Sequence, residues 1–149
     1  MTIKCPTLRL WRQAVFLAAA LCACLPLRAE MTNIDAAELA RLAAAGVTVV
    51  DVRRVDEWRE TGVISGSRRL TFVDAQGRVD PQWLEKMKAL ASPDQPVALI
   101  CRTGGRSAAA ARQLDEAGYK KVYNVQGGIT AWIKAGLPLT PLDGGEGRK

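Results

Sequence analysis

Cys101 begins a short run of residues whose types suit the binding of an anion, Cys101-Arg102-Thr103-Gly104-Gly105-Arg106. The two adjacent glycines relax the restriction on φ, so the backbone can curl until several N–H groups point at one centre. The helix expected next adds unsatisfied amides and a partial positive charge at its N-terminus. A thiol in such surroundings can ionise with a pKa well below the usual value of about 8.5, at roughly 3.5 to 7.5. The run therefore predicts a nucleophilic thiolate that needs no general base.

Histidine is absent from all 149 residues of the chain. Its absence excludes Ser-His-Asp triads, Cys-His pairs and histidine-ligated metal sites. Any acid–base chemistry must then use aspartate, glutamate, lysine, cysteine or water. We expect neither a metal nor a cofactor.

Strands and helices alternate along the part of the chain that must position the loop. An apolar strand at 97–100 runs directly into Cys101, and a helix with a small-residue inner face follows it. The other expected strands cover 47–52, 68–72 and 122–125, and the expected helices cover 33–46, 56–61, 81–90, 106–117 and 129–135. This alternation predicts an α/β domain with a central, mostly parallel sheet and helices on both faces. Active sites of such sheets lie beyond the carboxyl ends of the strands, where Cys101 stands.

The first 29 residues have the order of a secretory signal: a basic start, an apolar run at 14–25 and small residues before Glu30. The apolar run has 12 residues, fewer than the roughly 20 that a membrane-spanning helix needs. We therefore expect a signal peptide at 1–29, a single domain at 30–142 and a disordered Gly-rich tail at 143–149. A buried helix, a retained anchor and a lipid anchor at Cys24 are the alternatives for the first segment.

Removal of that segment changes both the charge and the cysteine count. Four of the 21 basic residues lie in it, so 17 basic and 15 acidic residues remain. Such a small net charge implies no nucleic-acid partner and no membrane partner. Cys5, Cys22 and Cys24 also lie in the segment, which leaves Cys101 alone. A single cysteine in an exported protein, periplasmic or secreted, suggests a reactive thiol or an intermolecular bond.

Four segments, in order along the chain, resemble the motifs of the rhodanese-like family, and in particular its single-domain exported sulfurtransferases. They are Asp51-Val52-Arg53 followed by Glu57-Trp58; Gly62-Val63-Ile64-Ser65-Gly66-Ser67; Cys101-Arg102-Thr103-Gly104-Gly105-Arg106-Ser107; and Val125-Gln126-Gly127-Gly128-Ile129-Thr130-Ala131-Trp132. Val63 and Ser65 stand where the family usually has histidine and proline. We expect a local change of packing there and no loss of activity.

The resemblance implies a thiosulfate sulfurtransferase with a single rhodanese-like domain. Cys101 would take sulfane sulfur from a small anionic donor such as thiosulfate, become a persulfide, and pass the sulfur to cyanide or another thiophilic acceptor. The amides of Arg102, Thr103, Gly104, Gly105 and Arg106 would cradle the sulfur. The side chains of Arg102 and Arg106 would attract the donor, and Arg106 has the equal alternative of capping the loop.

The resemblance also implies supporting roles around the loop. Ser107, at the start of the following helix, would help to close the loop, with the alternative that it caps that helix. Asp51, Arg53 and Glu57 would form an ion-pair group that steadies it.

Two other functions remain open at this point. One is a non-catalytic module, either a sulfur carrier for a protein partner or a binding domain. The intact cysteine argues against a pure binding domain, but a carrier differs from a transferase only in its acceptor. A phosphatase-type hydrolase is disfavoured, because related phosphatases have one more residue between cysteine and arginine, and the loop here contains no acid.

Overall fold

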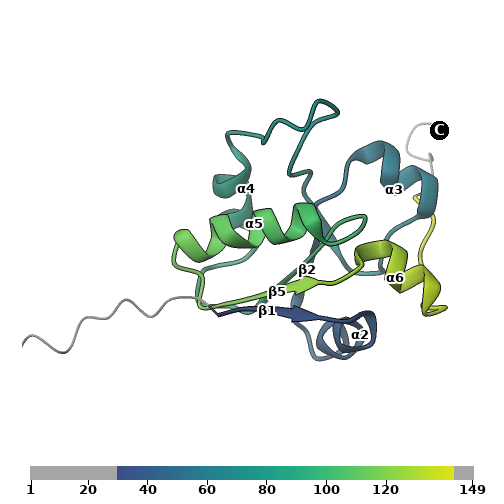
Figure 1. Cartoon of the computed structure of the whole chain (residues 1–149). Helices are drawn as coiled ribbons and strands as arrows, with labels where there is room; N and C mark the ends of the chain where they lie inside the picture. The colour runs from purple at the N-terminus through teal and green to yellow at the C-terminus, as the bar shows by residue number, and fades with distance from the viewer. Residues whose placement is uncertain (1–29, 143–149) are drawn as a thin grey trace, which may run out of the picture.

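A five-stranded parallel sheet forms the centre of the computed structural model, which describes residues 30–142 (Figure 1). The predicted signal at 1–29, with Cys24, and the predicted tail at 143–149 lie outside the described residues. The strands are β1 (Glu30–Ile34), β2 (Thr48–Asp51), β3 (Arg68–Arg69), β4 (Val97–Ile100) and β5 (Lys121–Val125), in the spatial order β1-β5-β4-β2-β3. All four strand pairings are parallel, which confirms the predicted α/β architecture.

The sheet separates two hydrophobic cores, as the unbroken apolar character of its strands predicts. Along β4 the side chains alternate between the faces: Val97 and Leu99 pack into one core, and Ala98 and Ile100 into the other. The first core is covered by α4 (Trp83–Leu90) and α5 (Gly105–Glu116), and the second by α2 (Ala36–Ala44) and α6 (Gly128–Lys134). The small α3 (Val55–Thr61) follows β2. It lies with α6 beyond the end toward which the strands point (Figure 1).

The first strand was missed by the sequence analysis. We expected a helix from residue 33, but Asn33 and Ile34 end β1, which pairs along its whole length with β5. The helix begins only after Asp35, whose carboxylate accepts a hydrogen bond from the Glu38 N–H at 2.7 Å and so caps α2. Residues 30–34 show no strong β-branched run, so their extended conformation depends on pairing with a distant strand.

Other boundaries differ by a few residues. The strand expected at 68–72 pairs only at Arg68–Arg69, and the helix expected from Pro81 begins at Trp83 after a turn. Gly46 follows α2 with φ of 87° and ends it, as its position predicts. Within residues 30–142, no helix is long and apolar enough to cross a membrane.

Candidate active site

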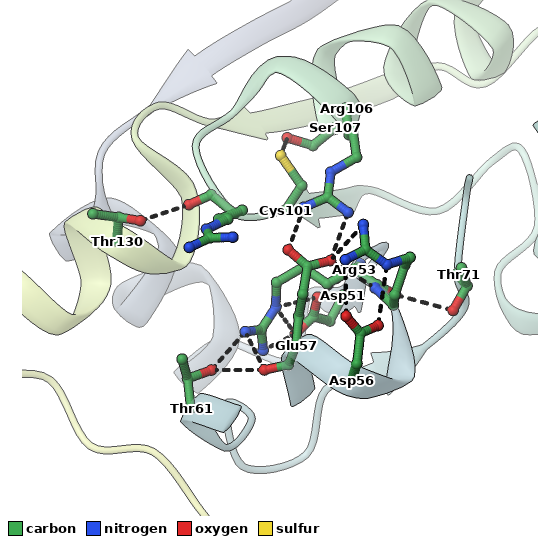
Figure 2. Close-up of polar contacts among 12 residues, drawn as sticks. Asp51, Arg53, Asp56, Glu57, Thr61, Thr71, Cys101, Arg106, Ser107 and Thr130 are labelled. Carbon is green, nitrogen blue, oxygen red and sulfur yellow. Dashed lines mark hydrogen bonds and ion pairs between the residues drawn. The ribbon is translucent and has the colours of Figure 1, made fainter. Parts of the chain in front are cut away.

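Cys101 lies at the carboxyl end of β4, in the middle of the sheet between β2 and β5. The residue is buried, with 1% of its surface exposed. Its Sγ accepts a hydrogen bond from the Gly104 N–H at 3.0 Å. Figure 2 shows the Ser107 hydroxyl beside the sulfur, at 3.3 Å. Of the five amides expected to cradle the sulfur, only that of Gly104 forms a hydrogen bond with it in the described part of the chain. The sulfur is therefore held by one amide and one hydroxyl, not by a complete ring of amides.

The N-terminus of α6 holds the first half of the loop through the backbone. The Ile129 N–H donates to the Cys101 carbonyl at 2.8 Å. The Arg102 carbonyl accepts from the Thr130 N–H at 3.2 Å and from the Thr130 hydroxyl at 3.0 Å. These bonds satisfy helix N–H groups that have no partner within the helix and draw the two loop carbonyls toward α6.

The close approach of α6 depends on Gly128. A Cβ placed on Gly128 would lie 2.3 Å from the Cys101 carbonyl oxygen and 2.7 Å from that of Arg102. Gly128 also has a φ of 54°, in the left-handed region. Sequence reasoning assigned no contact to this helix, although the paired glycines after a strand are the signal that could have located it.

The two glycines of the loop have different tasks. Gly104 has a φ of 99°, and a Cβ there would lie 3.1 Å from the Val125 carbonyl oxygen. Gly105 is the first residue of α5, has no positive φ, and has open space where a Cβ would stand. The turn that presents an N–H to the sulfur therefore requires glycine at position 104 alone.

Arg106 is held in a bidentate ion pair with Glu57 of α3. Its two terminal nitrogens donate to the two carboxylate oxygens at 2.7 and 2.6 Å. The Glu57 side chain is 5% exposed and that of Arg106 is 23% exposed. Burial alone would raise the pKa of Glu57, but hydrogen bonds from Arg106 and the Arg54 N–H, together with both arginine charges, outweigh it and hold that pKa below its usual value. The Glu57 hydrogen bond raises the pKa of Arg106.

Asp51 and Arg53 form a second, separate ion pair. The Arg53 Nε and Nη2 atoms donate to the Asp51 carboxylate at 2.7 to 3.0 Å, and both side chains are buried. Arg53 also donates to the Thr61 hydroxyl at 2.7 Å and to the Gly62 carbonyl at 2.8 Å. This pair therefore fixes the position of α3, which in turn carries Glu57 to the loop (Figure 2). The predicted ion-pair group is two pairs, only one of which reaches the loop.

Arg102 and Thr103 are the exposed side chains of the loop. Within residues 30–142 no carboxylate forms an ion pair with Arg102, so its guanidinium is the loop cation that is open to an anion. It borders a cavity of about 100 Å³ between α3 and α6, with Glu60, Thr130 and Ile133. The described residues contain no group of three or more cysteine, aspartate or glutamate side chains arranged to hold a metal ion.

A buried polar chain leads away from the sulfur through Ser107. The N-cap of α5 is Gly104, with no side-chain cap hydrogen bond, so Ser107 lies inside the helix and does not cap it. The Ser107 hydroxyl lies 2.7 Å from Asn124 Oδ1 and 3.1 Å from the Gly104 carbonyl oxygen. Asn124 in turn donates from Nδ2 to Asn33 Oδ1 at 2.8 Å. Asn124 and Asn33 were not predicted, because their contacts join strands that are distant in sequence.

Known proteins resemble this chain in sequence and in fold. Residues 35–135 match the family model of the rhodanese-like domain. Thiosulfate sulfurtransferase 18 of Arabidopsis thaliana is 34% identical over 115 residues, which cover 74% of this chain and 84% of the relative. A crystal structure of a rhodanese-related protein from Thermoplasma volcanium is 36% identical, with a TM-score of 0.60, and covers 73% of this chain and 97% of its own. The Rv0390 structure from M. tuberculosis, at 24% identity, a TM-score of 0.67 and coverage of 76% and 99%, shares the fold.

Proposed function

Because the chain belongs to the rhodanese-like family, we propose that it is a sulfurtransferase that carries sulfane sulfur on Cys101 from thiosulfate or a similar small anion to cyanide or another thiophilic acceptor. The observation that carries the proposal is the place of the Cys101 sulfur, at the carboxyl end of β4, with the Gly104 N–H directed at it and the Ser107 hydroxyl oxygen 3.3 Å away. Relatives named as thiosulfate sulfurtransferases support the choice of donor.

The reaction has two displacements and no net change of oxidation state. The Cys101 thiolate attacks the terminal sulfur of thiosulfate, the new S–S bond forms, and sulfite leaves with the electron pair of the old S–S bond. Cyanide then attacks the outer sulfur of the persulfide, thiocyanate forms, and the thiolate leaves with the electron pair of the second S–S bond. The steps need no redox cofactor.

The residues around the sulfur divide these tasks among them. The Gly104 N–H and the Ser107 hydroxyl stabilise negative charge on the sulfur. Arg102, exposed and without an ion-pair partner in the described chain, attracts the sulfonate end of the donor. Arg106 is a positioning residue, because Glu57 occupies both of its terminal nitrogens.

The burial of Cys101 favours sulfur transfer over phosphate-ester hydrolysis. Cys101 is 1% exposed. A donor that delivers a single terminal sulfur atom needs little space around such a thiol. A phosphoryl group also needs donors for its oxygens, and both terminal nitrogens of Arg106 are already bound to Glu57. The phosphatase alternative therefore loses support.

The compartment is part of the same proposal. The chain would be exported by its first 29 residues, and it would then act in the periplasm or outside the cell with Cys101 as its one thiol. Small diffusible ions would be its substrates, with no nucleic acid and no membrane as partners.

The test is a single-turnover experiment on the full chain. The protein is incubated with thiosulfate and digested with trypsin, the 89–102 peptide that holds Cys101 is examined by mass spectrometry, and thiocyanate is assayed after cyanide is added. We expect one added sulfur on this peptide and thiocyanate in equal amount, and neither in Cys101→Ser. Cys24→Ser is the matched control and should behave as the wild type.

Each other outcome has a definite meaning. An adduct without thiocyanate would identify a sulfur carrier for a protein acceptor. Release of phosphate from an aryl phosphate, with no sulfur adduct, would overturn the proposal.

A further inference from the structure

A chain of polar side chains runs from the Cys101 sulfur through the interior of the protein to its surface. Ser107 on α5 is fully buried and Asn124 on β5 is 5% exposed, whereas Asn33 on β1 is exposed. Asn124 faces the same side of the sheet as Val122, the side that α5 covers. It stands directly opposite Asn33 in the parallel β1–β5 pair. A polar side chain in the interior of a sheet has a desolvation cost, so its hydrogen bonds matter.

The Ser107 hydroxyl has one proton and three acceptors within reach. Asn124 Oδ1 is the nearest at 2.7 Å, an ordinary O–H···O distance, while the Gly104 carbonyl oxygen lies at 3.1 Å and the Cys101 sulfur at 3.3 Å. With this arrangement the proton points outward, toward Asn124. A neutral Cys101 thiol completes the chain by donating its S–H to the Ser107 oxygen.

Ionisation of the thiol changes the sulfur from a hydrogen-bond donor to Ser107 into an acceptor from it. A thiolate only accepts hydrogen bonds, so the Ser107 proton must turn toward it. The Ser107 oxygen would then face Asn124 Oδ1 at 2.7 Å with no proton between them, which is repulsive. A half-turn of the Asn124 carboxamide removes the conflict, because its NH₂ group then donates to Ser107 and its oxygen accepts from the NH₂ group of Asn33.

We propose that Asn124 is a positioning residue for sulfur transfer: its carboxamide, with Asn33, forms a reversible relay that lets Ser107 accept from the neutral thiol and donate to the charged sulfur. The inference rests on the proposed function for its biological use, but not for its test. The exposed end at Asn33 can turn freely in water, so the reversal moves one buried group only. The proton lost by the thiol passes to solvent.

The charged side chains that pack near the sulfur are paired, whereas Arg102, next to Cys101, is exposed and has no ion-pair partner within residues 30–142. Arg106 of α5 is bound to Glu57 of α3, and Asp51 at the end of β2 is bound to Arg53. These pairs are the same in both states of the relay. Variants of Asn124 and Asn33 therefore change the hydrogen bonds to Ser107 while they leave these pairs in place.

Alkylation of Cys101 by iodoacetamide as a function of pH tests the relay without any sulfur donor. The full chain is used, and the 89–102 tryptic peptide reports on Cys101 alone. In Asn124→Asp the carboxylate can only accept, so the Ser107 proton stays outward. We expect the alkylation rate at neutral pH to fall by on the order of tenfold, the effect of one lost hydrogen bond to a charged group, and the half-maximal pH to rise. Asn124→Leu removes the support of Ser107 without adding charge and should lie between the wild type and Asn124→Asp.

The exposed position 33 supplies a matched pair of variants with little risk to folding. In Asn33→Asp the new carboxylate can only accept hydrogen bonds, so it holds the Asn124 NH₂ group outward and blocks the reversal. We expect the alkylation rate to fall by about threefold. Asn33→Ala leaves Asn124 free to turn and should match the wild type. In a Ser107→Ala background all of these differences should vanish, because the relay acts only through Ser107.

Several results would overturn the proposal. Asn33→Asp could shift the profile equally in the Ser107→Ala background, or its effect could disappear at high salt; either result would indicate a through-space effect of charge. Faster alkylation of Asn124→Leu than of the wild type would make Asn124 a simple competitor for the Ser107 proton. Unchanged profiles in all variants would mean that the chain has no effect on the sulfur. Failure of thiocyanate formation in the wild type, with these shifts intact, would refute the proposed function and leave the relay standing.

Discussion

The loop that carries Cys101 is held from two sides by different kinds of contact, and different substitutions should disrupt each one. On one side, α6 binds the carbonyls of Cys101 and Arg102 through backbone N–H groups. On the other, α3 binds the start of α5 through the Glu57–Arg106 ion pair. A backbone clamp has no titratable group, but it tolerates no side chain at the point of contact. A side-chain clamp tolerates small shifts of the backbone, but depends on the charge of both partners.

The difference explains why the two clamps need different surroundings. The α6 contact works because Gly128 brings the helix within hydrogen-bond distance of the loop. The α3 contact works because the buried Asp51–Arg53 pair and its bonds to Thr61 and Gly62 hold the helix that presents Glu57. The loop is therefore positioned on the α6 side by the absence of a side chain at Gly128. On the α3 side it is positioned by a network of side chains.

Replacement of Gly128 by alanine should have the largest effect, because it breaks the backbone clamp. The new Cβ would lie 2.3 Å from the Cys101 carbonyl oxygen at a φ of 54°, so the loop and α6 must separate. We expect the free energy of unfolding in urea to fall by roughly 2–4 kcal/mol and thiocyanate formation to fall by about a hundredfold.

Gly136→Ala is the matched control for that variant. Gly136 follows α6 with a φ of 69° and has open space where a Cβ would stand, so the substitution imposes left-handed strain alone. We expect it to lower the free energy of unfolding by about 1–2 kcal/mol and to leave activity intact. Equal losses in the two variants would mean that close approach to the loop contributes nothing.

Glu57→Gln should have a smaller effect, because it weakens the side-chain clamp without moving the backbone. Arg106 keeps one neutral acceptor in place of a bidentate carboxylate. We expect the free energy of unfolding at neutral pH to fall by about 1–2 kcal/mol and thiocyanate formation by about tenfold. Glu85→Gln, which removes an exposed ion pair with Lys88, should change the free energy by less than about 0.5 kcal/mol.

The two clamps should also differ in how their contribution to stability depends on pH, because only the side-chain clamp contains a titratable group. The folded-state pKa of Glu57 lies below its usual value of about 4.3, so its stabilising effect is complete above that value and is lost as pH falls through the folded pKa. The wild type should therefore lose its advantage over Glu57→Gln in acid. Other carboxylates titrate alike in both proteins, and the difference isolates Glu57. A difference that stays constant down to acid pH would show that the charge of Glu57 does not matter.

The sequence predicts the features that depend on contacts between residues close together in the chain. It does not predict those that depend on contacts between distant residues. The strand before Cys101, the glycine turn and the helix after it follow from neighbouring residues, and the sequence analysis predicted all three. Strand β1 depends on pairing with β5, about 90 positions away in the chain. Glu57 and Arg106 were both recognised, but only the fold shows that they pair and leave Arg102 as the open cation. The contacts of Asn124 and the backbone bonds of α6 carry no residue-type signature that could have assigned them.

Thr130→Val should have the smallest effect and measures the one side-chain bond within the backbone clamp. The Thr130 hydroxyl donates to the Arg102 carbonyl at 3.0 Å, but the Thr130 N–H donates to the same oxygen and remains in the variant. Because the residue is exposed, water can replace the hydroxyl. We expect a loss of less than about 1 kcal/mol in the free energy of unfolding and less than a twofold change in thiocyanate formation. A tenfold loss of activity with unchanged stability would instead mean that the Thr130 hydroxyl touches the donor, and α6 would then bind substrate as well as the loop.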